Sequence, residues 1–429
     1  MSGPILTVAS TVGRFELGVL VLGGLLILGA LGSGLEGRRY FISLTSLFVL
    51  AGFVLGPGVT GALRFDARSS FVSELATVAL IVILLRDGLE VDGEMLQQHW
   101  ALPLRKLVLA MPLTALIVAL AARGLIGLSW TESLLLGALL SPTDPVLSSS
   151  VVSNPRVPRL IRHSLNLESG LNDGLALPGV LAFAAALAAG HGHFVWWHFV
   201  LQDVSIGLAT GVLVGFAGGL LMPRSQPLGE EIPAHQRSLY VLGVAFAAYG
   251  IAVLPPHGNG LIAVFVAAIT LGIRRPDLRQ YFHSQAADLV EIVKLGIFVV
   301  FGSLLTLHGL FGDGWGAVAI VAVTLFVARP VAVGAALWGT GCDAATRAFM
   351  AWFGPKGVAT VTFSLLVLSQ RITAGARIFN LAALTVVCSV FLHGATEKPG
   401  VEWIARRSER PRPVRDEISV RGQRAAPDP

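Results

Sequence analysis

Long runs of hydrophobic residues alternate with short polar connections along most of this chain. A helix needs roughly 20 apolar residues to cross a bilayer, and about 13 segments approach that length. They lie at about 15–33, 40–56, 71–89, 103–123, 131–153, 164–189, 197–222, 236–255, 258–274, 286–309, 313–339, 345–370 and 376–395. Because 54% of the 429 residues are hydrophobic and only 13% are charged, one soluble core is excluded. The pattern predicts an all-α polytopic membrane protein.

Basic residues favour one side of the predicted membrane. Connections after odd-numbered segments contain Arg38, Arg39, Arg105, Lys106, Arg156, Arg159, Arg162, Arg224, Arg237, Arg274, Arg275, Arg279 and Arg347. Connections after even-numbered segments contain only Arg64, Arg68, Arg123, Arg371 and Arg377. The positive-inside rule therefore predicts an external N-terminus and a cytoplasmic C-terminus in a cell (plasma or inner) membrane.

The net charge of +5 belongs mostly to these connections and to a basic, proline-rich tail, 396–429, which we expect to be disordered and cytoplasmic. This charge is typical of a topology signal beside anionic lipid, and we expect no nucleic-acid partner. Cys342 and Cys388 have no paired or metal-ligand spacing. Neither a disulfide framework nor a cofactor is predicted.

Two segments contain breaks in their helical pattern. Leu140-Ser141-Pro142-Thr143-Asp144-Pro145 interrupts the fifth, and Gly354-Pro355-Lys356-Gly357 interrupts the twelfth. The breaks lie an odd number of spans apart, so the two segments enter the membrane in opposite senses. Paired broken helices in corresponding positions indicate an inverted repeat with a binding site between the breaks. Asp144 and Lys356 can offset the terminal charges of the half-helices.

Polar groups of the sixth segment lie in the run Glu168-Ser169-Gly170-Leu171-Asn172-Asp173. Such groups are costly in a membrane and usually line an ion path or face a partner. Helical spacing places Ser169 and Asp173 on one face, and Glu168 and Asn172 on the next. A carboxylate at roughly 15 Å depth can bind either an alkali cation or a proton. We therefore predict that Asp173 exchanges a cation for a proton.

Other charged residues have less specific patterns. Arg329, inside the eleventh segment, needs a partner, and Glu168 is the best candidate for a structural pair. Asp87 lies near the end of the third segment, where a solvated interfacial acid is an equally good interpretation. Glu291 and Lys294 are three apart and can pair with each other. His191, His193 and His198 lie among tryptophans and indicate an interfacial segment rather than a metal site.

At these motifs, over nearly all of the membrane region, the chain resembles the monovalent cation:proton antiporters of the NhaP and Na+/H+ exchanger type. Ser141 to Pro145 is similar to the family's first broken helix, Asn172-Asp173 to its transport motif, and Gly354 to Gly357 to its second break. The resemblance implies an NhaA-like fold of about 13 transmembrane helices, with two discontinuous crossing helices. Transport helices would lie at 103–189 and 313–395, and scaffold or dimerisation helices at 15–89 and 197–309 of a domain spanning 1–395.

The resemblance also implies a homodimeric carrier, not an enzyme, that exchanges Na+ for H+ by an elevator motion. Asp173 would carry the ion, with Ser169 and Thr143 as oxygen ligands and Asn172 stabilising the site. Asp87 would help to coordinate the ion. The resemblance further implies a structural role for four charged residues, Asp144, Glu168, Arg329 and Lys356.

Two departures from the family qualify this comparison. Lys356 replaces the usual arginine, and Asp87 follows Arg86 in a motif that usually contains glutamate. The Asn-Asp pair implies, again by resemblance, electroneutral one-for-one exchange. The alternatives are a K+-selective efflux antiporter, use of Li+, a passive cation channel, or an intramembrane protease that uses Asp144 and Asp173 as an acid dyad.

Overall fold

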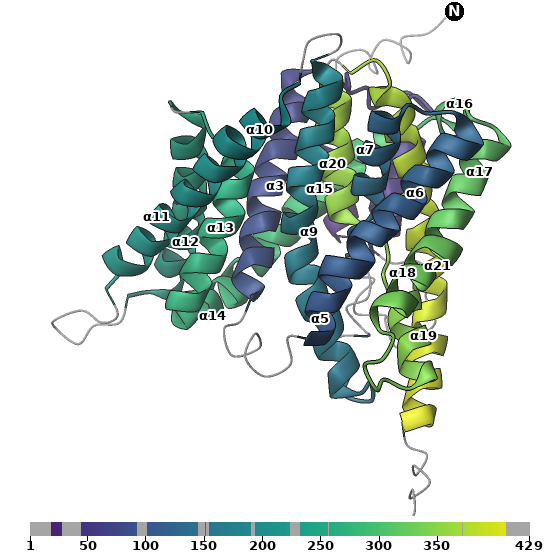
Figure 1. Cartoon of the computed structure of the whole chain (residues 1–429). Coiled ribbons are helices and arrows are strands. Elements are labelled where there is room, and N and C mark those ends of the chain that lie inside the picture. The colour runs from purple at the N-terminus through teal and green to yellow at the C-terminus, as the bar shows by residue number, and fades with distance from the viewer. Residues whose placement is uncertain are drawn as a thin grey trace, which may run out of the picture.

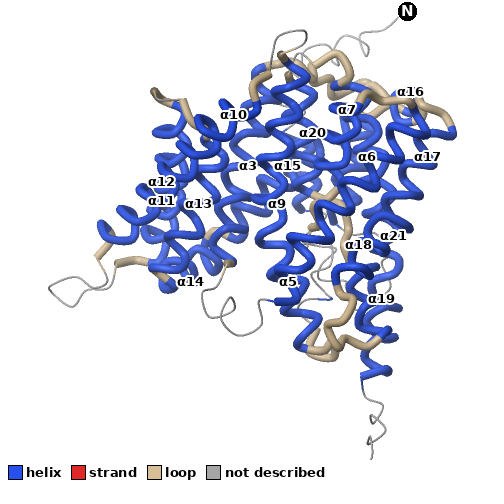
Figure 2. The backbone as a smooth tube through the Cα atoms, in the orientation of Figure 1, coloured by secondary structure: helices blue, strands red, loops and turns tan. Residues whose placement is uncertain are grey.

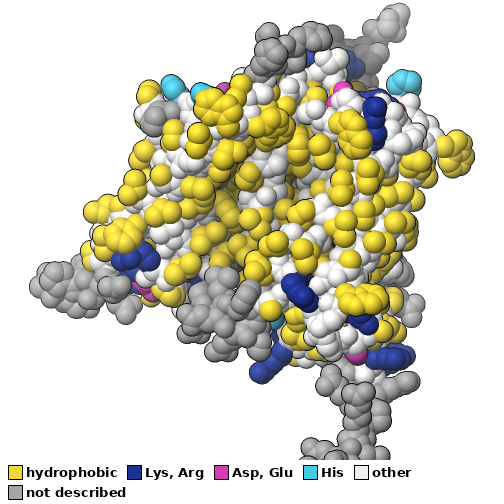
Figure 3. Space-filling model, viewed as in Figure 1, with side chains coloured by type: hydrophobic (Ala, Val, Ile, Leu, Met, Phe, Trp, Pro, Cys, Tyr) yellow, Lys and Arg dark blue, Asp and Glu magenta, His cyan; other side chains and the backbone are white. Residues whose placement is uncertain are grey.

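A computed structural model describes residues 19–27, 44–91, 101–144, 151, 154–189, 194–223, 232–255, 257–370 and 372–408. Every regular element within these residues is a helix (Figure 2). This agrees with the all-α class expected from the apolar segments. Apolar side chains cover the flank of the molecule over most of its height, and charged ones lie mostly toward its two ends (Figure 3).

Residues 19–27 are helical, and the later helices follow in chain order. Their bounds are α2 (Leu44–Leu55), α3 (Ser70–Glu90), α5 (Ala101–Arg105), η2 (Lys106–Ala110), α6 (Met111–Ile126), α7 (Trp130–Leu140), α9 (Arg159–Ala188), α10 (Trp196–His198), η4 (Phe199–Val204), α11 (Ser205–Leu221), α12 (Ala234–Val253), α13 (Gly260–Arg274), α14 (Pro276–Gln285), α15 (Ala287–Ser303), α16 (Leu307–Leu310), α17 (Trp315–Ala322), η5 (Val323–Ala328), α18 (Arg329–Ala336), α19 (Ala344–Trp352), α20 (Val358–Ser369) and α21 (Gly375–Ser408). The η elements are π-helical turns inside longer helices.

Helical residues fall within each of the predicted apolar segments. Within the described part of the chain, 6 helices are long and apolar enough to cross a membrane: Ala101–Ile126, Arg159–Ala188, Trp196–Leu221, Ala234–Val253, Trp315–Ala336 and Gly375–Arg407. Shorter apolar helices occur at Thr45–Leu55, Trp130–Leu140, Gly260–Arg274 and Val358–Ser369. The protein is therefore a multi-pass membrane protein, and the total number of crossings stays a prediction.

The predicted start of the C-terminal tail is wrong. Helix α21 continues through Pro399 to Ser408, and beyond Thr396 its inner face is still buried. Val401 and Ile404 pack in an apolar cluster, and the Trp403 ring stacks on Phe349 with centroids 6.5 Å apart. This burial keeps the helix intact beyond residue 396. The rest of the predicted tail, 409–429, lies outside the described residues.

Helices α11, α12, α13 and α14 form one side of the molecule, and α6, α17, α18, α19 and α21 form the other (Figure 1). Helices α3, α9, α15 and α20 lie between the two sides in this view. Glycines permit close approach within the first side. A Cβ added at Gly215 of α11 would lie 2.5 Å from the Ala267 carbonyl oxygen of α13. The middle helices α3 and α9 carry the polar site.

The two interrupted segments enter the bundle from opposite ends. Helix α7 begins where α6 finishes and ends at Leu140, whereas α19 begins at the other end of the molecule (Figure 1). After α19, the backbone from Phe353 to Gly357 is non-helical before α20 begins. The two breaks touch, because the Asp144 backbone N–H donates to the Pro355 carbonyl at 2.8 Å.

Candidate ion-binding site

Asp144 lies at the start of a half-helix. Its Oδ2 accepts a hydrogen bond of 2.8 Å from the backbone N–H of Val358, the first residue of α20. The first N–H groups of a helix lack partners within it and carry partial positive charge, so a carboxylate there is stabilising. Gly357 permits this approach, because a Cβ at that position would lie only 2.2 Å from Asp144 Oδ2.

Lys356 lies at the end of the other half-helix. Its Nζ donates to the carbonyl oxygens of Ser141 at 3.2 Å and Pro142 at 3.0 Å, directly after α7. The C-terminal carbonyls of a helix carry partial negative charge, so the buried ammonium complements them. The crossed breaks thus hold an acid at an N-terminus and a cation at a C-terminus.

Helix α21 also supports the second break through two residues that the sequence analysis missed. The Lys356 backbone N–H donates to Ser389 Oγ at 2.8 Å, and His393 Nε2 lies 3.0 Å from the Trp352 carbonyl oxygen. His393 Nδ1 lies 3.1 Å from Ser389 Oγ. Nδ1 also lies 2.9 Å from the Ser389 carbonyl oxygen, so the ring can donate to the Ser389 or the Trp352 carbonyl according to its tautomer. Ser389 and His393 are four residues apart in an apolar segment, and this spacing could have identified them from the sequence.

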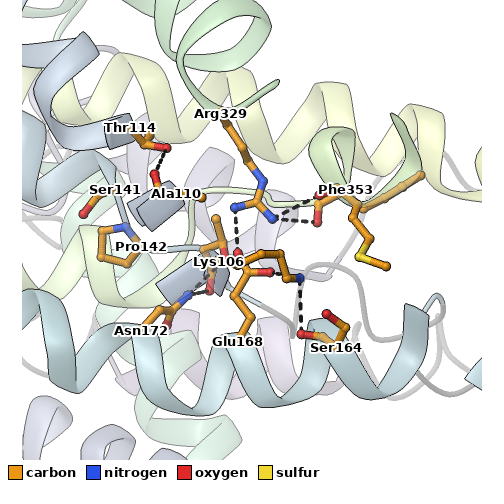
Figure 4. A network of polar contacts seen from close by, with 12 residues as sticks. Lys106, Ala110, Thr114, Ser141, Pro142, Ser164, Glu168, Asn172, Arg329 and Phe353 are labelled. Atoms are coloured by element: carbon orange, nitrogen blue, oxygen red, sulfur yellow. Dashed lines mark hydrogen bonds and ion pairs between the residues drawn. The ribbon is translucent and has the colours of Figure 1, made fainter. Parts of the chain in front are cut away.

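Glu168 of α9 forms two buried ion pairs (Figure 4). Its Oε1 lies 2.9 Å from Arg329 Nη1, the pair expected from the sequence. Its Oε2 lies 2.5 Å from Lys106 Nζ. Arg329 Nη2 also donates to the carbonyl oxygens of Met350 and Phe353, each at 3.3 Å. One carboxylate therefore joins two cations from different helices.

The placement of Lys106 in a cytoplasmic connection was wrong. The residue begins η2 in the helix Ala101–Ile126, and only 1% of it is exposed. Its neighbour Arg105 is exposed and donates to the Trp338 carbonyl. Of these two adjacent basic residues, Arg105 therefore lies at the surface and Lys106 in the interior. A lysine inside the predicted segment 103–123 was the signal that could have identified it.

Gly354 makes room for the Arg329 guanidinium. A Cβ at Gly354 would lie 1.8 Å from Arg329 Nε, a distance that no side chain can tolerate. The two glycines of the second break therefore serve two charged side chains, Gly354 for Arg329 and Gly357 for Asp144. Substitution at either position would displace a buried charge.

Asn172 and Asp173 follow Glu168 along α9. Asn172 Nδ2 donates to the Thr143 carbonyl at 2.6 Å and lies 3.0 Å from Thr143 Oγ1, which ties α9 to the first break. Among the described residues, Asn172 Oδ1 and Asp173 Oδ1 have no hydrogen-bond partner although both are buried. The side chain of Ser169 lies outside the described residues. Two buried acceptor oxygens therefore remain available to a cation or a proton donor.

Asp87 of α3 faces Asp173. Both acids are buried, and their carboxyl groups lie near enough to interact with each other. The approach of α9 to α3 depends on Gly170, where a Cβ would lie 3.2 Å from the Asp87 carbonyl oxygen. The interpretation of Asp87 as a solvated interfacial acid is wrong. The acid that accompanies Asp173 is Asp87, whereas Asp144 accepts from α20.

A small cavity lies between α6, α9 and the first break. Its polar lining consists of Thr114, Ser141, Thr143, Glu168, Asn172 and Arg329. In the described ranges, no three His, Cys, Asp or Glu side chains are grouped to hold a metal ion. The Glu291–Lys294 pair is present at 2.5 Å. His198 lies beside Trp197 in α10, while His191 and His193 fall outside the described residues.

Touching half-helices, buried charges and unpartnered buried oxygens beside them define a membrane carrier of ions. Residues 23–403 match the protein family described as "sodium/hydrogen exchanger, transmembrane". The chain belongs to this family, in the monovalent cation:proton antiporter superfamily, whose members are transporters and not enzymes.

Individual relatives give the same family. The K(+)/H(+) antiporter NhaP of Alkalimonas amylolytica is 26% identical over 399 residues, covering 91% of this chain and 67% of the relative. The K(+)/H(+) antiporter NhaP2 of Shewanella oneidensis is 24% identical over 359 residues, covering 83% and 62%. The chain thus spans about two thirds of the length of these relatives.

A solved structure has a similar fold. The sodium proton antiporter MjNhaP1 from Methanocaldococcus jannaschii superposes with a TM-score of 0.76 at 20% identity. The superposition covers 89% of this chain and 99% of the neighbour. At this identity the likeness concerns the fold.

Proposed function

We propose that this protein is a secondary antiporter that exchanges a monovalent cation for a proton at Asp173. The observation that carries the proposal is the pair of facing carboxyl groups, Asp87 and Asp173, beside the unpartnered oxygens of Asn172 and Asp173. Oxygen ligands suit hard alkali cations, and a carboxylate also binds a proton. Because both ligands need the same acid, each displaces the other.

The ion site in this proposal uses Asp173 as carrier, with oxygens of Thr143 and Ser169 as further ligands and Asn172 as a support. Thr143 is held in place by the Asn172 amide. Asp87 contributes a second carboxyl group from α3. Asp144, Glu168, Arg329 and Lys356 hold the surrounding backbone and do not touch the ion.

The identity of the cation is a choice between Na+ and K+, with Li+ as a third candidate. The named relatives are K(+)/H(+) antiporters, whereas the structural neighbour is a sodium proton antiporter. Our first candidate remains Na+, exchanged one for one with H+ without net charge movement. The K+-selective efflux antiporter is the second.

The motion we propose is an elevator. Asp173 lies on α9, in the predicted transport group 103–189, and Asp87 lies on α3, in the predicted scaffold group 15–89. A site between two groups of helices opens to alternate sides when one group slides past the other. The homodimer, the inverted repeat, the external N-terminus and the cytoplasmic C-terminus complete this proposal.

Proteoliposomes test the proposal directly. Purified protein is reconstituted with an internal pH-sensitive dye, a pH gradient is imposed, and Na+, K+ or Li+ is added with the voltage clamped or free. An antiporter dissipates the gradient only when its cation is added, and electroneutral exchange proceeds at the same rate under both voltage conditions. Cation flux without coupled proton movement would instead identify a passive channel.

A further inference from the structure

Lys106 is a buried charge in the site that the proposed function does not yet use. Its ammonium donates to two groups on α9, the Glu168 carboxylate at 2.5 Å and the Ser164 carbonyl at 3.3 Å. An ammonium inside a membrane protein is costly unless it has such partners. Glu168 already has a charged partner in Arg329, so charge neutrality does not require Lys106.

Lys106 and Arg329 both lie beside a π-helical turn. Each lies on the helix that precedes a broken segment, Lys106 at the start of η2 and Arg329 directly after η5. A π-helical turn shifts the direction of the side chains that follow and occurs frequently at functional sites. The two cations reach the same carboxylate of Glu168 from η2 and α18 (Figure 4).

One face of α9 is held at three successive turns. Ser164, Glu168 and Asn172 are spaced by four and share that face. Lys106 binds the first two, Arg329 binds the second, and Thr143 accepts from the third. These contacts fix the rotation of α9 about its axis.

The rotation of α9 determines where the ion ligands point. Asp173 is one residue after Asn172, about 100° further around the helix, and its carboxyl group meets Asp87 of α3. A small rotation would move Asn172 away from Thr143 and Asp173 away from Asp87. Contacts at Ser164 and Glu168 therefore affect ligand geometry one to two turns away.

We infer that Lys106 is a positioning residue for ion exchange, which fixes the rotation of α9 through Glu168 and Ser164 and so aims Asn172 and Asp173 at the ion. This inference rests on the proposed function. Lys106 itself touches neither the ion nor its ligands. Loss of a residue that orients metal ligands typically weakens metal binding by 10–100-fold.

The test compares Lys106→Met with a neighbouring control, Arg105→Met, in the proteoliposome assay. Arg105 is on the same helix, but its side chain is exposed and donates to the Trp338 carbonyl, away from α9. We expect Lys106→Met to raise the apparent KM for the cation at least about tenfold while retaining the maximal rate, and Arg105→Met to change neither. An unchanged KM for Lys106→Met, or a lost maximal rate at unchanged KM, would overturn the inference.

A second variant at Lys106 keeps the test decisive. Lys106→Arg retains donors for Glu168 and Ser164, should fold even where Lys106→Met does not, and is expected to have the wild-type KM. A KM raised as far as in Lys106→Met would overturn the inference. Failure of the wild-type protein to exchange any alkali cation would instead refute the proposed function.

Coupling to Asn172 tests the route through α9. If Lys106 acts by aiming Asn172, the KM change of Lys106→Met should be much smaller on an Asn172→Ala background than on the wild type. Effects of residues that act through one another are not additive. Fully additive changes would overturn the proposed route.

Discussion

Replacing Glu168 by glutamine should destabilise the protein more than removing either of its partners. The carboxylate is only 7% exposed and pairs with both Lys106 and Arg329. Glutamine has nearly the same size but no charge, so both cations would remain buried without a counter-charge. Breaking a buried ion pair in this way costs about 3–5 kcal/mol. Lys106→Met leaves one intact pair, and its cost should be smaller.

The free energy of unfolding, measured by chemical denaturation in micelles, checks this prediction. The matched control is Glu402→Gln, which removes an exposed pair to Arg406 at 3.1 Å on α21. Exposed pairs contribute about 0–1 kcal/mol, so the control should resemble the wild type. Equal stability of Glu168→Gln and Glu402→Gln would show that the buried cluster does not hold these helices together, and our reading of it would be refuted.

The remaining predictions concern the break and the two acids. Gly357→Ala should displace the Asp144 carboxylate from α20 and abolish exchange, whereas Gly334→Ala, with nothing within 4 Å, should keep it; equal transport rates would contradict this. Asp173→Ala should abolish cation-dependent proton movement in a protein that still elutes as a single species from a sizing column. Asp87→Asn should raise the apparent KM for the cation without abolishing exchange, and an unchanged KM would remove Asp87 from the site.

The sequence predicted features that depend on local pattern. Apolar segments of spanning length marked the helices, and prolines marked the breaks at Pro142 and Pro355. The energetic cost of an arginine in an apolar segment pointed to an acid partner, and Arg329 does pair with Glu168. Each of these inferences rests on the free-energy cost of placing polar groups inside a membrane, which is large however the helices pack.

Features that depend on how helices rotate against one another could not be predicted. Lys106 is adjacent to Arg105, and only the packing of η2 on α9 separates a buried from an exposed side chain. The meeting of Asp87 with Asp173 depends on the approach of α3 and α9. The extension of α21 beyond residue 396 depends on burial of Val401 against other helices, which overrides the effect of a proline.

If a cation and a proton compete for Asp173, binding of the cation must release a proton from the protein. Purified protein in weakly buffered detergent solution is titrated with Na+, K+ or Li+ while a pH-sensitive dye records released protons. We expect binding of the transported cation to release protons from the wild type, and Asp173→Ala to release none. Cation binding by the wild type without any proton release would contradict this expectation.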